Sequence, residues 1–271
     1  MNKDLVPNLH WWNEAAPLHA ASAFYDVEGF LNGRSTLMEI EKVKLGDLRG
    51  KKLLHLQCHF GMDTLSLARL GAQVTGVDFS PEAIKLAKSL NEKLGLDAEF
   101  ICSNIYDLRQ NLSGQYDIVY TSYGVLCWLN DLPGWGEIIA HFLKPGGQFL
   151  IVEGHPLANM FIAEEGLLQM ADSYFYDPTP YTDTSDGTYA APDAVKQHKT
   201  TNEWAHSISE IMQVLWSAGL TITSFEEYPY CFYEKFAGMM GQTDSGWWVL
   251  KNEKHKLPMM FSMTAKKDNE S

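Results

Sequence analysis

The fold is decided by residues 52–82, which read KLLHLQCHFGMDTLSLARLGAQVTGVDFSPE. Two apolar runs, Lys52–Leu56 and Gln73–Asp78, predict strands, and Asp63–Arg69 between them predicts a helix. The residues Ser80-Pro81-Glu82 then predict a helix start, with Ser as N-cap, Pro in the first turn and Glu at the positive end of the helix dipole. Apolar strands separated by helices indicate a parallel sheet that is covered on both faces.

The same alternation continues toward the C-terminus. The second helix runs to about Leu94 and ends at Gly95. Further strands are expected at Ala98–Cys102, Tyr116–Thr121, Gln148–Glu153, Leu220–Phe225 and Met259–Ala265, further helices at Trp135–Phe142 and Ser207–Ala218, and a turn at Pro145–Gly147. We therefore predict an α/β, doubly wound, mostly parallel sheet.

Two segments fall outside this alternation. Residues 1–50 are rich in aromatic side chains, and residues 155–205 carry several tyrosines among Pro, Gly, Asp and Thr without a clear period. A long segment of this kind is usually a functional cap or loop. We divide the chain into an N-terminal lid segment (1–50), a cofactor-binding core (51–154), an inserted cap (155–205) and a closing part of the core (206–271).

Composition excludes several classes of protein. The chain has 271 residues, 45% of them hydrophobic, and a net charge of −13. This charge disfavours nucleic acid and anionic membrane surfaces, which are bound mainly through Lys and Arg. No apolar run approaches membrane-spanning length, no signal peptide is recognisable at the N-terminus, and the four cysteines lack CxxC spacing. We expect a cytoplasmic protein with no metal; self-association through exposed aromatic patches stays open.

Asp78 ends the second predicted strand, 21 residues after Gln57 in the loop that follows the first strand. Ligands of open parallel sheets bind beyond the carboxyl ends of the strands. A carboxylate at this spacing accepts hydrogen bonds from both hydroxyls of a ribose. The alternative role for Asp78 is a helix cap before Ser80. We favour the ribose because of the strand-end position.

The loop after the first strand narrows the choice of cofactor. A dinucleotide needs several glycines so that the backbone can approach its pyrophosphate. Here Gln57 and His59 occupy such positions and Gly61 is the glycine that remains, and there is no P-loop. A ribose-bearing cofactor without phosphates fits better. We expect S-adenosylmethionine, whose cationic sulfonium also suits an acidic protein.

The stretch from about residue 50 to 155 resembles the class I S-adenosylmethionine-dependent methyltransferases, with weaker similarity from His206 to Ala265. Five motifs occur in order: LLHLQCHFG, VTGVDFSPEAI, FICSNIYDL, YDIVYTSYGVLCWL and LKPGGQFLIVEGHP. The resemblance implies a seven-stranded Rossmann-like sheet whose last strand is antiparallel, the two closing strands supplying the final pair. The first motif, HLQCHFG, is similar to a variant found in a group of bacterial methyltransferases.

The resemblance also implies site residues. By this resemblance, Asp78 would hold the ribose. The adenine would lie against Phe79, Asn104 and Ile105, and the methionine part would lie near Thr121, Ser122 and Tyr123. His55, Gln57 and His59 depart from the family's usual pattern of an acid and a glycine-rich loop. Gln57 and His59 still offer polar contacts to the methionine carboxylate.

The acceptor side is less defined. Methyl transfer is an in-line displacement that rests on positioning and desolvation, and a base is needed only when the acceptor arrives protonated. The candidate bases are His155, Tyr123 and His59; the alternative role for His155 is to satisfy the turn before Pro156. For His206 we favour capping or packing.

Aromatic side chains of the two flanking segments are expected to close over the pocket. Trp12 and Tyr25 would cover the cofactor, together with Trp11, Tyr174, Phe175 and Trp204. Individually each of them is better explained as a hydrophobic staple of the cap. Collectively they indicate a closed pocket for a small, partly apolar acceptor, whose acceptor atom the sequence leaves open.

Three other functions compete with this one. A non-catalytic binding protein that has kept the methyltransferase fold is favoured by His55 in place of the acid. A nicotinamide-dependent oxidoreductase is opposed by the missing glycines. An RNA methyltransferase is opposed by the net charge of −13.

Overall fold

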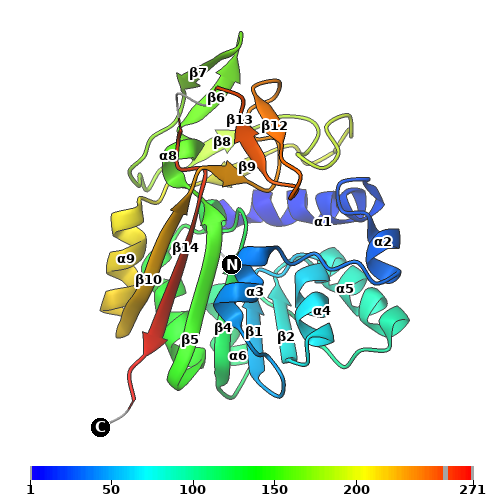
Figure 1. Ribbon diagram of the computed structural model, residues 1–271, viewed down its shortest axis with the longest axis vertical. Coiled ribbons are helices and arrows are strands. Elements are labelled where there is room, and N and C mark those ends of the chain that lie inside the picture. Colours follow the sequence, from blue (N-terminus) through cyan, green and yellow to red (C-terminus); the bar gives the residue numbers. More distant parts are fainter. Residues whose placement is uncertain (1, 253–255, 270–271) are drawn as a thin grey trace.

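The computed structural model describes residues 2–252 and 256–269, and a seven-stranded sheet forms its centre (Figure 1). The strand order is β10-β14-β5-β4-β1-β2-β3. Neighbouring strands among β1 to β5 are parallel, whereas β14 is antiparallel to both β5 and β10. The predicted fold is therefore confirmed. The strands are β1 (Lys52–Leu56), β2 (Gln73–Asp78), β3 (Glu99–Cys102), β4 (Tyr116–Ser122), β5 (Leu143–Gly154), β10 (Leu220–Tyr228) and β14 (Met260–Lys267).

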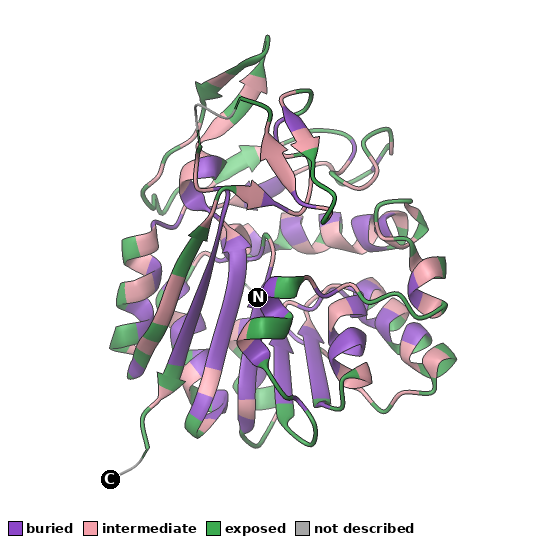
Figure 2. Cartoon of the chain, viewed as in Figure 1, coloured by how far each residue is buried: buried purple, intermediate pink, exposed green. Residues whose placement is uncertain are grey.

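Helices cover both faces of the sheet, and the strands between them are largely buried (Figure 2). On one face Trp135 and Ile211 pack in the same core as Val119. On the other face Ile40 and Leu67 pack with Leu53. The helices of the core are α3 (Glu39–Leu45), α4 (Met62–Arg69), α5 (Pro81–Leu94), α6 (Leu108–Asn111), α7 (Leu132–Phe142) and α9 (Ile208–Ser217), with 3-10 turns η2 (Ile105–Asp107) and η3 (Leu126–Trp128).

Most element boundaries follow from local chemistry. The Ser80 hydroxyl accepts from the Ala83 amide at 3.2 Å, which is the expected cap of α5. In contrast, α7 begins three residues before the predicted start, because Asp131 caps it by accepting from the Gly134 amide at 3.0 Å. The predicted turn at Pro145–Gly147 lies inside β5, where the pairing with β4 shifts register.

The cap contains more regular structure than the sequence predicted. Two short hairpins lie within 155–205, and a small sheet is inserted between β10 and β14 (Figure 1). Strands of two to four residues are too short to show a period. These elements are α8 (Pro156–Asn159), β6 (Phe161–Glu164), β7 (Leu167–Met170), β8 (Tyr181–Asp183), β9 (Thr201–Glu203), β11 (Tyr230–Cys231), β12 (Met240–Gln242) and β13 (Trp248–Leu250).

The N-terminal segment joins the cap to the core. It forms η1 (Lys3–Leu5), α1 (Val6–Ala21) and α2 (Val27–Leu31), and α1 lies between the sheet and the cap strands (Figure 1). The Asn8 side chain donates to the Asn202 carbonyl at 2.8 Å and accepts from the Asn202 amide at 2.7 Å. Within the described residues no helix combines the length and apolarity that crossing a membrane requires.

Candidate functional site

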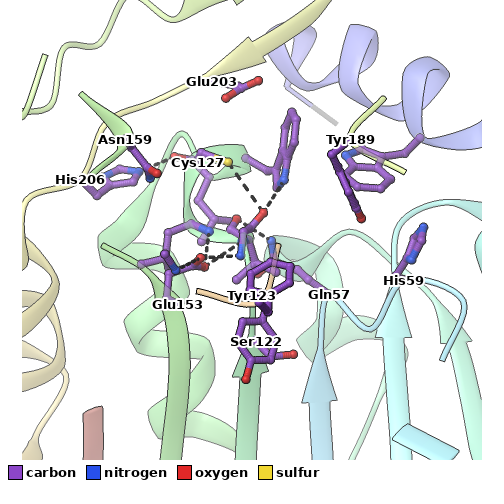
Figure 3. Close-up of a pocket in the computed structure, with 18 of the residues that line it drawn as sticks. Gln57, His59, Ser122, Tyr123, Cys127, Glu153, Asn159, Tyr189, Glu203 and His206 are labelled. Atoms are coloured by element: carbon purple, nitrogen blue, oxygen red, sulfur yellow. Dashed lines mark hydrogen bonds between the residues drawn. The ribbon is translucent and has the colours of Figure 1, made fainter. Parts of the chain in front are cut away.

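A cavity of about 1170 Å³ lies at the carboxyl ends of β1, β2 and β4, beneath α1 and the cap (Figure 3). Twelve of the residues singled out from the sequence line it: Trp12, Tyr25, His55, Gln57, His59, Gly61, Asp78, Phe79, Asn104, Ile105, Ser122 and Tyr123. Thr121 and His155 do not. One small-molecule site typically occupies roughly 300–1,000 Å³, so this cavity has room for a cofactor and an acceptor together.

The loop after β1 adopts the backbone shape of a glycine-rich loop without its glycines. Gln57, His59 and Gly61 have φ values of +56°, +53° and +81°. L-residues rarely occupy this left-handed region, and such strain persists mainly where a ligand site requires it. At Gly61 the side chain is excluded as well, because a Cβ would lie 2.6 Å from the Phe100 ring.

Two polar atoms of this loop have no partner in the described part of the chain. The Gln57 amide donates to the Val125 carbonyl at 3.0 Å, while its Oε1 is buried without a hydrogen bond. His59 Nε2 is also buried without a hydrogen bond. Burial lowers the pKa of His59 well below its usual value, so the imidazole is neutral. Both side chains line the cavity, where a polar ligand or an ordered water can satisfy them.

Asp78 lies at the end of β2 and faces the loop. Its Oδ2 accepts from the His59 amide at 2.8 Å and its Oδ1 from the Ser80 amide at 2.9 Å. Burial raises its pKa to about 6, although these amides oppose the shift. The carboxylate therefore both holds the amide of Ser80, the N-cap residue of α5, and borders the cavity. Each oxygen still has a lone pair for a ribose hydroxyl.

The residues expected at the adenine lie beyond β2 and β3. Phe79, Asn104 and Ile105 line this end of the cavity. The Asn104 oxygen already accepts from the Tyr106 amide at 2.9 Å, where it caps η2. The sequence did not predict that Asn104 caps η2. This hydrogen bond leaves the oxygen with one lone pair for a ligand.

At the other end, β1 and β4 bring His55 and Ser122 together. His55 Nδ1 lies 2.8 Å from the Thr64 hydroxyl, and its Nε2 lies 3.4 Å from the Ser122 hydroxyl. Burial lowers the pKa of His55 to about 3, so it carries no charge. Asp63, in the first turn of α4, also lines the cavity; burial raises its pKa, and the nearby Thr36 and Ser122 hydroxyls oppose that shift. The sequence reading assigned Asp63 only to a helix.

Thr121 does not take its expected place. It is fully buried and pairs with Ile151 in the β4–β5 register, so its side chain points into the packed interior, while Ser122 lines the cavity. Adjacent side chains of a strand point to opposite faces. The cavity lining therefore gives no support to the predicted contact of Thr121 with the methionine part.

His155 also lies outside the cavity. Its Nδ1 accepts from the Leu157 amide at 3.1 Å, which caps α8, and its Nε2 lies 2.9 Å from the Glu227 carboxylate. With both nitrogens engaged away from the pocket, the residue performs the turn-satisfying role before Pro156. This placement argues against His155 as the base.

Tyr123 lines the cavity, with its backbone at φ +47°. Its pKa is raised well above the usual value by burial and by the nearby Glu41 carboxyl, so the phenol stays protonated at neutral pH. The following loop is held by Glu153 at the end of β5, which accepts from the amides of Gly124, Val125, Leu126 and Gly154 (Figure 3). Tyr123 is thus held in place at the cavity, but it is a poor base.

Aromatic side chains from the N-terminal segment close the cavity over the loop. Trp12 and Tyr25 contact the His59 ring, with centroids 5.2 and 5.4 Å away. The hydroxyls of Tyr25 and Tyr189 are hydrogen-bonded, which ties this segment to the cap. Trp11 and Tyr174 are absent from the lining, whereas Phe175 and Trp204 belong to it.

The cap side of the cavity carries ionisable groups that sequence reasoning missed. Glu203, at the end of β9, lines the cavity with Lys235 and Asp172 (Figure 3 shows Glu203 above the site). Burial, with the Asp183 and Asp172 charges, raises the pKa of Glu203 to about 7. Lys235 donates to the Asn159 side chain at 2.9 Å. No motif marks these residues, because chain folding alone brings them to the pocket.

His206 also lines the cavity, and one of its two ring nitrogens has a hydrogen-bond partner among the described residues. Its Nε2 lies 2.8 Å from the Leu129 carbonyl, its Nδ1 lies 3.4 Å from the Glu210 carboxylate, and its ring stacks on Tyr176. These contacts give it a packing role.

Comparison with known proteins agrees with this geometry. A family model described as a methyltransferase domain matches residues 54–151. A ubiquinone biosynthesis O-methyltransferase of Xanthomonas euvesicatoria is 30% identical over 141 residues, which are 52% of this chain and 54% of that protein. The chain thus matches only about half the length of such relatives.

Solved structures share the fold. An S-adenosylmethionine-dependent methyltransferase from Mesorhizobium loti has a TM-score of 0.60 at 16% identity, over 88% of this chain and 100% of that one. A protein of the same description from Listeria monocytogenes has a TM-score of 0.58 at 19% identity, over 84% of this chain and 95% of that one.

Proposed function

We propose that the protein transfers a methyl group from S-adenosylmethionine to a small, partly apolar molecule, because residues 54–151 match a methyltransferase domain and the chain shares the fold of S-adenosylmethionine-dependent methyltransferases. The observation that carries this proposal is the meeting of Asp78 with the left-handed loop of Gln57 and His59 at one cavity. The cofactor, when bound, supplies a methyl group activated by a cationic sulfonium.

The residues present fit this cofactor. Asp78 offers two carboxylate oxygens to a ribose, and a polar ligand can satisfy the unpartnered atoms of Gln57 and His59. Phe79 and Ile105 supply apolar walls at the β2–β3 end of the cavity. The four backbone amides bound to Glu153 fix the loop after β4. In this way the chain positions the methyl donor and excludes water from it.

We place the acceptor on the cap side of the cavity. Trp204, Tyr181 and Phe232 line this part with aromatic surface, which suits a partly apolar molecule. The cavity lies beneath α1 and the cap. The matched relative is an O-methyltransferase by name, so a hydroxyl is the first acceptor group to test.

Glu203 is the group best suited to take the acceptor's proton. It lines the acceptor side, and its pKa of about 7 lets it be ionised and still basic near neutral pH. Lys235, beside it, would stabilise the anion of a deprotonated hydroxyl. His155 lies outside the cavity, and burial keeps Tyr123 protonated.

The second candidate is a binding protein of the same fold without turnover. The neutral His55 at the end of β1 favours it. An acceptor screen separates the two: the purified protein is incubated with S-adenosylmethionine and a panel of small phenols, alcohols and amines, and S-adenosylhomocysteine is measured. Release that depends on one acceptor class supports the enzyme. Cofactor binding with no release across all classes supports the binding protein.

A further inference from the structure

We propose that Asp63 binds the ammonium group of the amino-acid half of S-adenosylmethionine. The inference rests on the proposed function and assigns a residue that no sequence motif marked. Asp63 stands in the first turn of α4, directly after the loop that ends at Gly61, and it lines the cavity.

The position follows from the sheet order. β2 and β3 adjoin at one end, where Asp78, Phe79 and Ile105 form the adenosine side. β1 and β4 adjoin on the other side of β2, so a cofactor anchored at Asp78 extends its amino-acid half over them. Asp63 belongs to this second region, because α4 begins directly after the loop that follows β1, and Asp63 lines the cavity together with His55 of β1 and Ser122 of β4.

The charge of Asp63 is unbalanced within the described residues. None of the ion pairs found there includes Asp63. The titratable groups whose pKa its charge raises include the Glu41 carboxyl and the Tyr123 phenol, and neither of these is a cation. The cations that line the cavity are engaged elsewhere: Arg34 with Asp26, and Lys235 with Asn159. A carboxylate in this setting is stabilised by a cationic ligand.

The other carboxylates of the cavity are unsuitable for this task. Glu153 is saturated by four backbone amides. Asp78 is held at the ribose position by the His59 and Ser80 amides. Glu203, Asp172 and Asp177 belong to the inserted cap and not to the β1–β4 end. His55 is neutral and cannot replace them. Asp63 is therefore the anion at the β1–β4 end.

The test compares ligands with and without the amino-acid half. Calorimetry measures the Kd of S-adenosylhomocysteine and of 5′-methylthioadenosine, which lacks that half, for the wild type, for Asp63→Asn and for the control Asp97→Asn. Asp97 is an exposed acid away from the cavity, and its substitution changes net charge equally. We expect Asp63→Asn to raise the Kd of S-adenosylhomocysteine roughly 10- to 100-fold, as for loss of a charged hydrogen bond. The Kd of 5′-methylthioadenosine should stay within about twofold of the wild type.

A second arm changes the ligand and then combines this change with the altered protein. The analogue of S-adenosylhomocysteine that lacks the amino group should bind the wild type weakly, by the same factor, and should lose no further affinity in Asp63→Asn. Two results would overturn the assignment. The first is that Asp63→Asn weakens S-adenosylhomocysteine and 5′-methylthioadenosine equally. The second is that Asp63→Asn weakens the analogue without the amino group as much as it weakens S-adenosylhomocysteine. A wild type that binds neither nucleoside would overturn the proposed function itself.

Discussion

The left-handed backbone at Gln57 gives a prediction that reverses an ordinary rule of stability. At most positions alanine is more stabilising than glycine, because glycine loses more conformational freedom on folding. At φ +56° the Cβ of any L-residue is strained by about 1–2 kcal/mol, and glycine escapes this strain. Its extra unfolded-state entropy costs about 0.4–1 kcal/mol. Gln57→Gly should therefore be more stable than Gln57→Ala by about 0.5–1 kcal/mol.

The comparison isolates the backbone. Both substitutions remove the hydrogen bond to the Val125 carbonyl and the unpartnered oxygen equally, so these contributions cancel. Ser89, exposed in the interior of α5, is the matched control: Ser89→Gly should be less stable than Ser89→Ala by about 1 kcal/mol. Urea unfolding of the ligand-free protein gives the four free energies. If Gln57→Gly is the less stable of its pair, the loop is not strained and its glycine-like shape is not a feature of the site.

Three further outcomes are expected. Asp78→Ala should abolish most affinity for S-adenosylmethionine in calorimetry, and an unchanged Kd would refute the ribose assignment. Burial raises the pKa of Glu41 from 4.5 to about 7, so its contribution to the free energy of unfolding is present at acid pH and is lost as pH rises through 7. This loss is about 3 kcal/mol. Urea titrations at pH 5 and pH 8 should show the loss in the wild type and a much smaller one in Glu41→Gln. With a working acceptor, the rate of methyl transfer should rise with pH through about 7, as Glu203 ionises. Glu203→Gln should remove this rise. A pH–rate profile that is the same in Glu203→Gln as in the wild type would exclude Glu203 as the base.

The sequence predicted the core well because burial on both faces leaves strong local signals. The runs at Lys52–Leu56 and Gln73–Asp78 are strands, and Ser80 caps the next helix. Positions tied to strand ends, such as Asp78 and Ser122, lie at the cavity as expected. Thr121, one residue before Ser122, is buried and outside the cavity lining, since adjacent side chains of a strand point to opposite faces.

The cap side could not be predicted in the same way. His155 follows a strand that ends at the cavity, but its ring turns to Glu227 and to the first turn of α8. Glu203 and Lys235 are 32 residues apart in the sequence and meet only through the packing of short cap strands. The left-handed backbone at His59 was equally hidden, because a histidine gives no local signal for it. Such features depend on tertiary contacts rather than on local pattern.

Calorimetry of the wild-type protein with S-adenosylmethionine, S-adenosylhomocysteine and NAD tests the cofactor assignment most directly. The carboxylate of Asp78 beside a loop without dinucleotide glycines predicts micromolar binding of the first two ligands and none of NAD. Binding of NAD, or no binding of either S-adenosyl compound, would contradict the assignment of this cavity.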